Sequence, residues 1–460
     1  MVLLTFCYLC KINSKKKSVM NHLIESIGTF LWGWPMIILL LGTHLYLTVR
    51  LKFPQRRIFK AIRLSIQKDD GSPGDVSQFG ALATSLAATI GTGNIVGVAT
   101  AVALGGPGAI FWCWITGVLG IATKYGEGLL AVKYRVKTRT GKMIGGPMFA
   151  LQKGLGMKWL AVLFCIFTAM ASFGIGNMVQ SNAISMLCHD SMGIPTWMSG
   201  LAVTLLAALV ILFGVKGIAR VCTAFVPLMA LLYVLGCIYI LCVNASFIWP
   251  AIQLILRTAF QPEAGMGGAV GSSLILTARY GIARGLFSNE SGMGSAPIVA
   301  AAAQTRNPVR QALVSSSATF WDTVVICLLT GLVIVSTLLA YDIDLQGIAG
   351  GSLTREAFSR IPFVGSPLLT FGVITFAFST ILGWSYYGER AVEYLAGRRL
   401  ILLYRLLFIV AIFLGSLFEL TLVWNLSDLM NALMAIPNLL SLLLLSGVIV
   451  HETKKYGKDL

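Results

Sequence analysis

Charged residues are scarce in this chain of 460 residues. Asp, Glu, Lys and Arg together make up 12% of it, about half the share typical of soluble globular proteins. Hydrophobic residues make up 57%, and the mean hydropathy is +0.82. A water-soluble fold cannot hide so much apolar surface, because much of any globule faces water. The composition therefore excludes a soluble protein and predicts one that is embedded in lipid.

The patterns that carry enzymatic or metal chemistry are also absent. No GxSxG, HExxH or phosphate-binding loop occurs. The nine cysteines are scattered, mostly in apolar segments, with one CxxC at Cys7 and Cys10. The four histidines lack metal-ligand spacing; they are His22, His44, His189 and His451. We therefore expect neither an enzyme nor a zinc or redox protein.

Apolar runs of membrane-spanning length occupy most of the chain. A spanning helix needs about 20 mainly apolar residues. Eleven segments meet this need, near 28–49, 79–103, 106–132, 157–187, 195–215, 221–243, 265–300, 311–340, 366–388, 400–423 and 425–450. Between two of them, 247–256 is apolar enough to lie flat as an interfacial helix. No linker separates soluble domains, so 20–460 is expected to be one transmembrane domain, and 1–19 an unstructured extension with Met20 as an alternative start.

Lys and Arg are distributed unequally between the two sets of loops. The formal net charge is +17, but the basic residues stand between apolar runs and do not form a surface for nucleic acid. If the loop after the first span is cytoplasmic, 24 of them lie on that side and seven on the other. The positive-inside rule then predicts an external N-terminus and a cytoplasmic C-terminus.

Two of the eleven spans are interrupted by glycine and polar residues. The second is cut at Gly91–Asn94 and the seventh at Ser288–Ser295. These spans are five apart, so the chain divides into halves of five spans, 79–243 and 265–450, with the first span outside both. Because five is odd, the halves have opposite topology. Matching breaks in two inverted halves indicate the binding site of a transporter, since free amides attract a carboxylate and free carbonyls a cation.

Several polar residues inside spans are candidates for function. Glu290 lies within the second break, where it could carry protons or only brace the backbone. Asn177 and Gln180 are i, i+3 neighbours predicted to share a helix face; a polar bond between helices is the alternative for each of them. Glu127 lies near a helix end, which favours a structural salt bridge. Arg279 and Arg284 are possible partners of either glutamate.

Five sequence pieces resemble the alanine or glycine:cation symporters, also called sodium:alanine symporters. They are 91–101, 105–112, 124–127, 145–148 and 287–297, and the resemblance covers roughly 21–450. Ser291 and Met293 stand where the family pattern leads us to expect Ala and Leu, and they flank the second break. The resemblance implies an all-α membrane protein with a LeuT-type inverted repeat of five plus five helices.

The resemblance also implies a set of site residues. The amides of Thr92 and Gly93 would bind the substrate carboxylate. The wider expected substrate set is Thr92, Gly93, Asn94, Gln180, Phe287, Ser288, Asn289 and Trp384. A first Na⁺ would meet Thr89 and Asn94, and a second would lie between the carbonyls of Ala87 and Ile90 and the hydroxyls of Ser379 and Thr380. For these two hydroxyls, bonding back to their own helix is the alternative.

The sequence thus predicts Na⁺-coupled symport of alanine or glycine into the cell by alternating access. H⁺ coupling and an uncoupled facilitator or channel are the alternatives. The expected surroundings are the bacterial inner membrane, with a small neutral amino acid as substrate, no nucleic acid and a monomeric state. Alanine versus glycine preference, tolerance of D-amino acids and stoichiometry stay open.

Overall fold

The computed structural model describes residues 22, 24, 26–28, 30–67, 72–260, 274–343, 345, 350–418 and 421–457. The predicted extension 1–19 lies outside the described residues. Within them the fold is almost entirely helical, with one two-stranded antiparallel sheet. The predicted all-α polytopic architecture is confirmed.

The first half of the chain contains the elements up to the helix that was predicted to be interfacial. They are α3 (Trp34–Arg50), η1 (Pro54–Arg57), α4 (Ile58–Ile66), α5 (Gln78–Thr89), η2 (Gly93–Gly97), α6 (Val98–Gly105), α7 (Ala109–Lys133), β1 (Val136–Lys137), β2 (Met143–Ile144), α8 (Pro147–Phe149), η3 (Ala150–Gly154), α9 (Lys158–Phe173), η4 (Gly174–Met178), α10 (Val179–Met192), α11 (Thr196–Ile211), α12 (Gly214–Val243) and α13 (Ala245–Phe260).

The second half begins with the second interrupted helix. Its elements are α14 (Leu274–Asn289), α15 (Ala296–Ala300), α16 (Pro308–Thr319), η5 (Phe320–Cys327), α17 (Leu328–Ala340), α18 (Gly350–Ser359), α19 (Gly365–Ala396), η6 (Arg398–Leu400), α20 (Ile401–Leu417), α21 (Thr421–Leu444) and α22 (Ser446–Tyr456).

Each predicted span corresponds to a helix or to a run of consecutive helices. Six helices of the described chain are long and apolar enough by themselves to cross a membrane, and two bent pairs raise this to as many as eight. One bent pair is α5 with η2 and α6, which turn by 52° at the predicted break. The segment predicted to be interfacial is also helical, as α13. The larger boundary errors are the start of α12, at Gly214, seven residues before the predicted span, and the end of α19, at Ala396, eight residues beyond it.

Local sequence explains where the first broken helix begins and ends. The Ser77 hydroxyl caps α5 by accepting a hydrogen bond from the Gly80 amide at 3.0 Å. The helix ends at Thr89, where Ile90 turns to an extended conformation (ψ 94°). The chain then restarts as η2, a short π-helix. Such wide turns often occur at functional sites.

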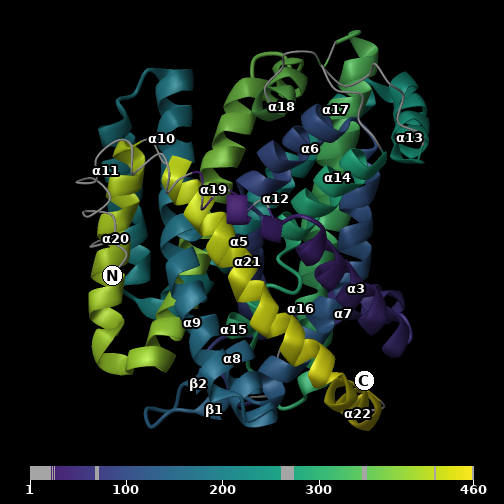
Figure 1. Cartoon of the computed structure of the whole chain (residues 1–460). Coiled ribbons are helices and arrows are strands. Elements are labelled where there is room, and N and C mark those ends of the chain that lie inside the picture. Colours follow the sequence, from purple (N-terminus) through teal and green to yellow (C-terminus); the bar gives the residue numbers. More distant parts are fainter. Residues whose placement is uncertain are drawn as a thin grey trace.

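The broken helices lie in the middle of the bundle (Figure 1). α5 contacts α12, α15, α16 and α19, and α14 contacts α6, α7 and η2. The α18 end of the molecule carries α13 and α18, and the hairpin end carries β1, β2, α8 and α22 (Figure 1). Each break therefore lies between these two ends, within the protein interior.

Candidate functional site

Asn94 fixes the backbone at the first break. Its side-chain oxygen accepts a hydrogen bond from the Gly91 amide at 2.9 Å, and its Nδ2 donates to Asp322 Oδ1 at 2.7 Å. Asn94 is fully buried. Its carbonyl oxygen keeps a second lone pair, so the side chain can brace the break and still contribute an oxygen to a cation.

The amides that follow the break are free. Among the described residues, neither the Thr92 nor the Gly93 amide has a hydrogen-bond acceptor. Both residues line a cavity of about 530 Å³ that opens at the α18 end, together with Phe287 of α14. Free amides at a helix start attract an anion. The cavity therefore gives a carboxylate a route to the amides predicted to bind it.

Oxygen atoms predicted to form the second cation site come together behind the break. The Ala87 carbonyl accepts hydrogen bonds from Ser379 Oγ at 3.1 Å and from Thr380 Oγ1 at 3.2 Å. Both hydroxyls also bond to the Phe376 carbonyl of their own helix. The bonding within the helix that was given as the alternative is therefore present as well. Carbonyl and hydroxyl oxygens suit a hard cation, and the carbonyls that end a half-helix carry partial negative charge. The donor set fits Na⁺.

Gly91 is the close contact between the first break and α19. A Cβ atom at Gly91 would lie 2.8 Å from Thr380 Oγ1, whereas a Cβ at Gly93 would have no neighbour nearer than 3.7 Å. Gly93 therefore has room for one additional carbon atom. The position where helix packing demands glycine is Gly91.

The second break, residues 290–295, is held by one turn of α7. Lys124 Nζ donates to the carbonyl of Asn289, the last residue of α14, at 3.0 Å. Glu127 Oε1 accepts from the amides of Gly292 and Gly294, at 3.1 and 3.0 Å, and from Asn438. Lys124 and Glu127 are 1% and 2% exposed. The Lys124 ammonium thus binds the carbonyl end of one half-helix, and the Glu127 carboxylate binds the amides that lead into the next.

Glu127 therefore has a structural role, but not the predicted one. Its hydrogen-bond partners are backbone amides and Asn438, and no ion pair between Glu127 and a described residue forms. The other suggested pairing also differs: Arg284 faces the 530 Å³ cavity, away from both glutamates' hydrogen bonds.

Glu290 has partners on both oxygens. Oε2 accepts from Ser295 Oγ at 2.5 Å, and Oε1 accepts from the Trp384 indole N–H at 3.2 Å. Its backbone is left-handed (φ 52°), a conformation uncommon for a non-glycine residue. The Glu290 side chain thus connects the second break to α19, as expected if it braces the backbone.

Asp322 is a site residue that the sequence analysis missed. It is fully buried in η5. Its carboxylate accepts from Asn94 of the first break and from Ser288 beside the second, at 2.7 and 3.0 Å. An acid within the apolar run 320–327 was the available signal, because ionisable residues inside spans are functional by default.

The two amide side chains of the fourth span make separate hydrogen bonds. Asn177 Nδ2 donates to the Phe408 carbonyl of α20, which is the interhelical bond given as its alternative. Gln180 Nε2 donates to Ile175 O, and its Oε1 is buried without a partner among the described residues. Asn177 lies in the π-helix η4 (Gly174–Met178), whose turn is wider than that of the regular helix on which the prediction was based.

The remaining predicted substrate residues lie deeper than the cavity wall. Ser288 and Asn289 are buried, and Asn289 Oδ1 accepts from the Ser291 amide at 2.9 Å. Trp384 is buried against Gly176, where a Cβ would be 2.2 Å from the tryptophan. These three side chains surround the break and are not part of the cavity lining.

The hairpin end is closed by Arg135. Its guanidinium donates to the carbonyls of Ala301 and Ala303 after α15, at 3.1 and 2.8 Å, and to Pro73 O before α5, at 3.2 Å. A parallel bridge between Val76 and Ala303 joins the same two segments directly. The entry to α5 and the exit from α15 are thereby held together.

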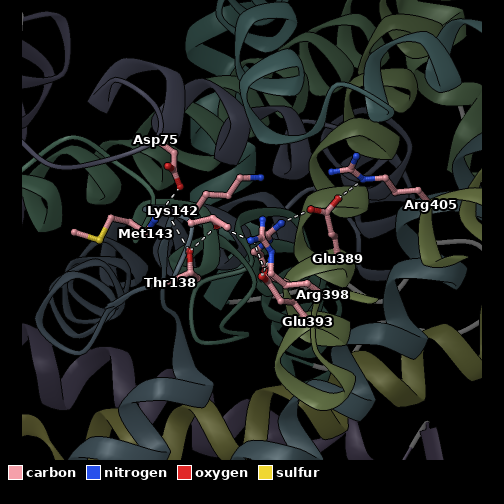
Figure 2. Close-up of polar contacts among 10 residues, drawn as sticks. Asp75, Thr138, Lys142, Met143, Glu389, Glu393, Arg398 and Arg405 are labelled. Carbon is pink, nitrogen blue, oxygen red and sulfur yellow. Dashed lines mark hydrogen bonds and ion pairs between the residues drawn. The ribbon is translucent and has the colours of Figure 1, made fainter. Parts of the chain in front are cut away.

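The hairpin and α19 extend this closure (Figure 2). The Met143 amide donates to Asp75 at 3.0 Å, and Arg398 donates to Thr140 Oγ1 at 2.5 Å. Arg405 of α20 pairs with Glu389 of α19 at 2.6 Å. The hairpin end is therefore tied across α5, α19 and α20, while the α18 end is open to the central break.

This arrangement defines a class of membrane proteins by its fold, the LeuT-type fold that the sequence resemblance led us to expect. The structure resembles that of MhsT in complex with L-phenylalanine, with a TM-score of 0.54 and 14% identity over 82% of this chain and 90% of that one. It also resembles a Na⁺-coupled sialic acid symporter, with a TM-score of 0.53 and 13% identity over 92% and 86% of the two chains. Likenesses at such low identity show the fold and not the substrate.

The family model of the sodium:alanine symporters matches residues 17–460, and the chain belongs to that family. It is 48% identical to the sodium/alanine symporter AgcS of Methanococcus maripaludis, over 95% of this chain and 97% of that protein. It is 36% identical to the probable sodium/glutamine symporter GlnT of Bacillus subtilis, over 96% and 92%. The protein is thus a sodium-coupled symporter of the membrane and not an enzyme.

Proposed function

We propose that the protein carries alanine or glycine into the cell together with Na⁺, loading both from the α18 end. The observation that carries this proposal is the difference between the two breaks. At the first, the Thr92 and Gly93 amides are free and face a cavity. At the second, Lys124 and Glu127 already satisfy the backbone. The first break is therefore the one with binding capacity for a zwitterion.

Na⁺ is proposed to bind beside Ala87, Ser379 and Thr380. The three oxygens converge beside the same break that is proposed to bind the carboxylate. Na⁺ bound there increases the affinity of the first break for the substrate carboxylate, because both ligands bind the same stretch of backbone. This shared backbone supplies the coupling between ion and solute.

Proton coupling is the alternative. Glu290 and Asp322 are buried acids near the breaks. The bonds of Glu290 to Ser295 and Trp384 favour bracing over proton transfer. The open α18 end and the closed hairpin end favour alternating access over an uncoupled channel.

The preference for a small substrate is supported by similarity. Identity to the relative named for alanine is 48%, against 36% to the one named for glutamine. The charge distribution of the loops supports a cytoplasmic hairpin end in the inner membrane. We also propose that the protein works as a monomer.

The test is uptake of labelled alanine by proteoliposomes that contain the purified protein. We expect accumulation with an inward Na⁺ gradient, little with a K⁺ gradient of equal size, and competition by glycine but not by glutamine. Accumulation driven by a pH gradient alone would contradict Na⁺ coupling. Equilibration without accumulation on any gradient would identify a facilitator.

A further inference from the structure

A basic cleft lies at the hairpin end. It shares no lining residue with the substrate cavity. It has a volume of about 690 Å³ and lies between the end of α3, η1 and α22. Six Lys and Arg side chains line it: Arg50, Lys52, Arg56, Arg57, Lys454 and Lys455. Among the described residues no Asp or Glu lines it. The transport cycle proposed above does not use this cleft.

The six cations have no acidic partners in the described part of the chain. None of them takes part in a salt bridge there. Three instead contact aromatic side chains. Arg50 donates to the Tyr46 hydroxyl, and the Arg56 guanidinium lies 5.4 Å from the centre of the Phe53 ring. Lys455 Nζ lies 5.0 Å from the centre of the Tyr456 ring. Like charges held together without an anion repel one another. An anionic ligand would remove that repulsion.

The backbone that forms the cleft has an uncommon conformation. Lys52 and Phe53 both have φ of 59°, in the left-handed region where glycine is usual. The turn is closed by hydrogen bonds from Lys52 N to Val49 O and from Phe53 N to Thr48 O, at 3.0 and 2.8 Å. Glycine would form this turn with less strain, but it would remove two side chains that line the cleft. The chain nevertheless has Lys52 and Phe53 at these two positions, and both line the cleft.

Apolar surface continues from the cleft onto the neighbouring helix. Phe53, at the edge of the cleft, is 48% exposed, and Phe59 and Ile66 of α4 are 78% and 71% exposed. Phe59 and Ile66 are seven residues apart and share one face of α4. An amphipathic helix of this kind lies at a membrane interface with its apolar face toward the acyl chains. The cleft thus joins cationic groups to an apolar surface at one level of the protein.

We propose that this cleft binds the phosphate headgroup of an anionic phospholipid, whose acyl chains lie along α4. Basic pockets between helices on the cytoplasmic side are suited to anionic headgroups, and Arg forms paired hydrogen bonds with phosphate oxygens. A soluble phosphate ester shares the anionic chemistry, but it would gain nothing from Phe53, Phe59 and Ile66. The assignment to the cytoplasmic leaflet rests on the orientation proposed from the loop charges.

The experiment measures lipid retention by the full-length protein in detergent. Phosphatidylglycerol, cardiolipin or phosphatidylcholine is titrated in, and the bound lipid is counted by native mass spectrometry. The test variant is Arg56→Gln with Arg57→Gln. The matched control is Lys137→Gln with Arg139→Gln, which removes two exposed cations from the hairpin at the same end of the molecule but outside the cleft.

We expect the wild type and the control to retain phosphatidylglycerol and cardiolipin in preference to phosphatidylcholine. The test variant should lose this preference by roughly 25-fold, since each of the two basic groups removed contributes a factor of about five in affinity. Equal retention by the test and control variants would overturn the proposal. Displacement of the bound lipid by millimolar glycerol 3-phosphate or inorganic phosphate would also overturn it, because the cleft would then be a site for a soluble anion.

Discussion

Replacing Gly91 by alanine tests whether the first break and the Na⁺ oxygens act as one unit. The added Cβ would lie 2.8 Å from Thr380 Oγ1, and ordinary contact begins at 3.4 Å. The hydroxyl must then retreat by about 0.6 Å. It already stands 3.2 Å from the Ala87 carbonyl, near the upper limit for a hydrogen bond. The substitution should therefore separate this hydroxyl from the cation site.

The expected size follows from the loss of one polar ligand. A hydrogen bond to a charged group contributes about 1.5–3 kcal/mol, and 1.4 kcal/mol is a factor of ten in affinity. The Na⁺ concentration for half-maximal alanine uptake should rise roughly tenfold to a hundredfold in Gly91→Ala. Gly93→Ala is the matched control. Its Cβ would meet Phe287 at 3.7 Å, so its Na⁺ dependence should stay within about twofold of the wild type.

The Thr380→Ala variant tests whether the effect of Gly91→Ala arises from the contact between the added Cβ and the Thr380 hydroxyl. With the hydroxyl removed, the nearest atoms to a Cβ at Gly91 are 3.9 Å away. Adding Gly91→Ala to Thr380→Ala should then cause no further rise in the Na⁺ requirement, a non-additivity typical of residues in contact. The assay is proteoliposome uptake at fixed alanine over a range of external Na⁺. Additive effects, or an unchanged Na⁺ requirement in Gly91→Ala alone, would refute the reasoning.

Four further substitutions address the other parts of the site. Gly93→Val places two methyl groups in the substrate cavity, so the KM for alanine should rise by about tenfold with membrane insertion unchanged; a normal KM would remove Gly93 from the site. Glu290→Gln keeps part of the bracing, so Na⁺-driven uptake should survive in part; strong wild-type uptake on a pH gradient, lost in this variant, would show that H⁺ is the coupling ion. Glu127→Leu leaves two buried amides unpaired at about 1–3 kcal/mol each, so the thermal midpoint in detergent should fall by several degrees, and an unchanged midpoint would argue against the bracing role. Arg135→Gln loosens the hairpin end, so a cysteine placed at Ala303 should react faster with a maleimide added from that side; equal rates would mean that the bridge between Val76 and Ala303 closes this end unaided.

The sequence was sufficient to locate both breaks, because glycine and polar residues inside an apolar run cannot lie in lipid as a regular helix. It also brought Ser379 and Thr380 to the first break through the family resemblance. Their contact with Ala87 agrees with that expectation, whereas their role in Na⁺ binding stays a prediction.

Other parts of the site depend on contacts between distant segments. The role of Lys124 and Glu127 appears only when α7 lies against residues 289–294, and no local pattern encodes that pairing. The π-helix η4 around Asn177 was not predicted either, since the residue spacing was interpreted with a regular helical period. Asp322 could have been found from its burial in an apolar run, and its two partners could not.

The Lys124 and Glu127 side chains distinguish the two breaks in what each can exchange with the surroundings. Both side chains belong to the protein, so a solute could bind at the second break only by displacing their hydrogen bonds. At the first break the Thr92 and Gly93 amides have no such partners among the described residues. A solute can therefore come and go at the first break, whereas the second serves as a support.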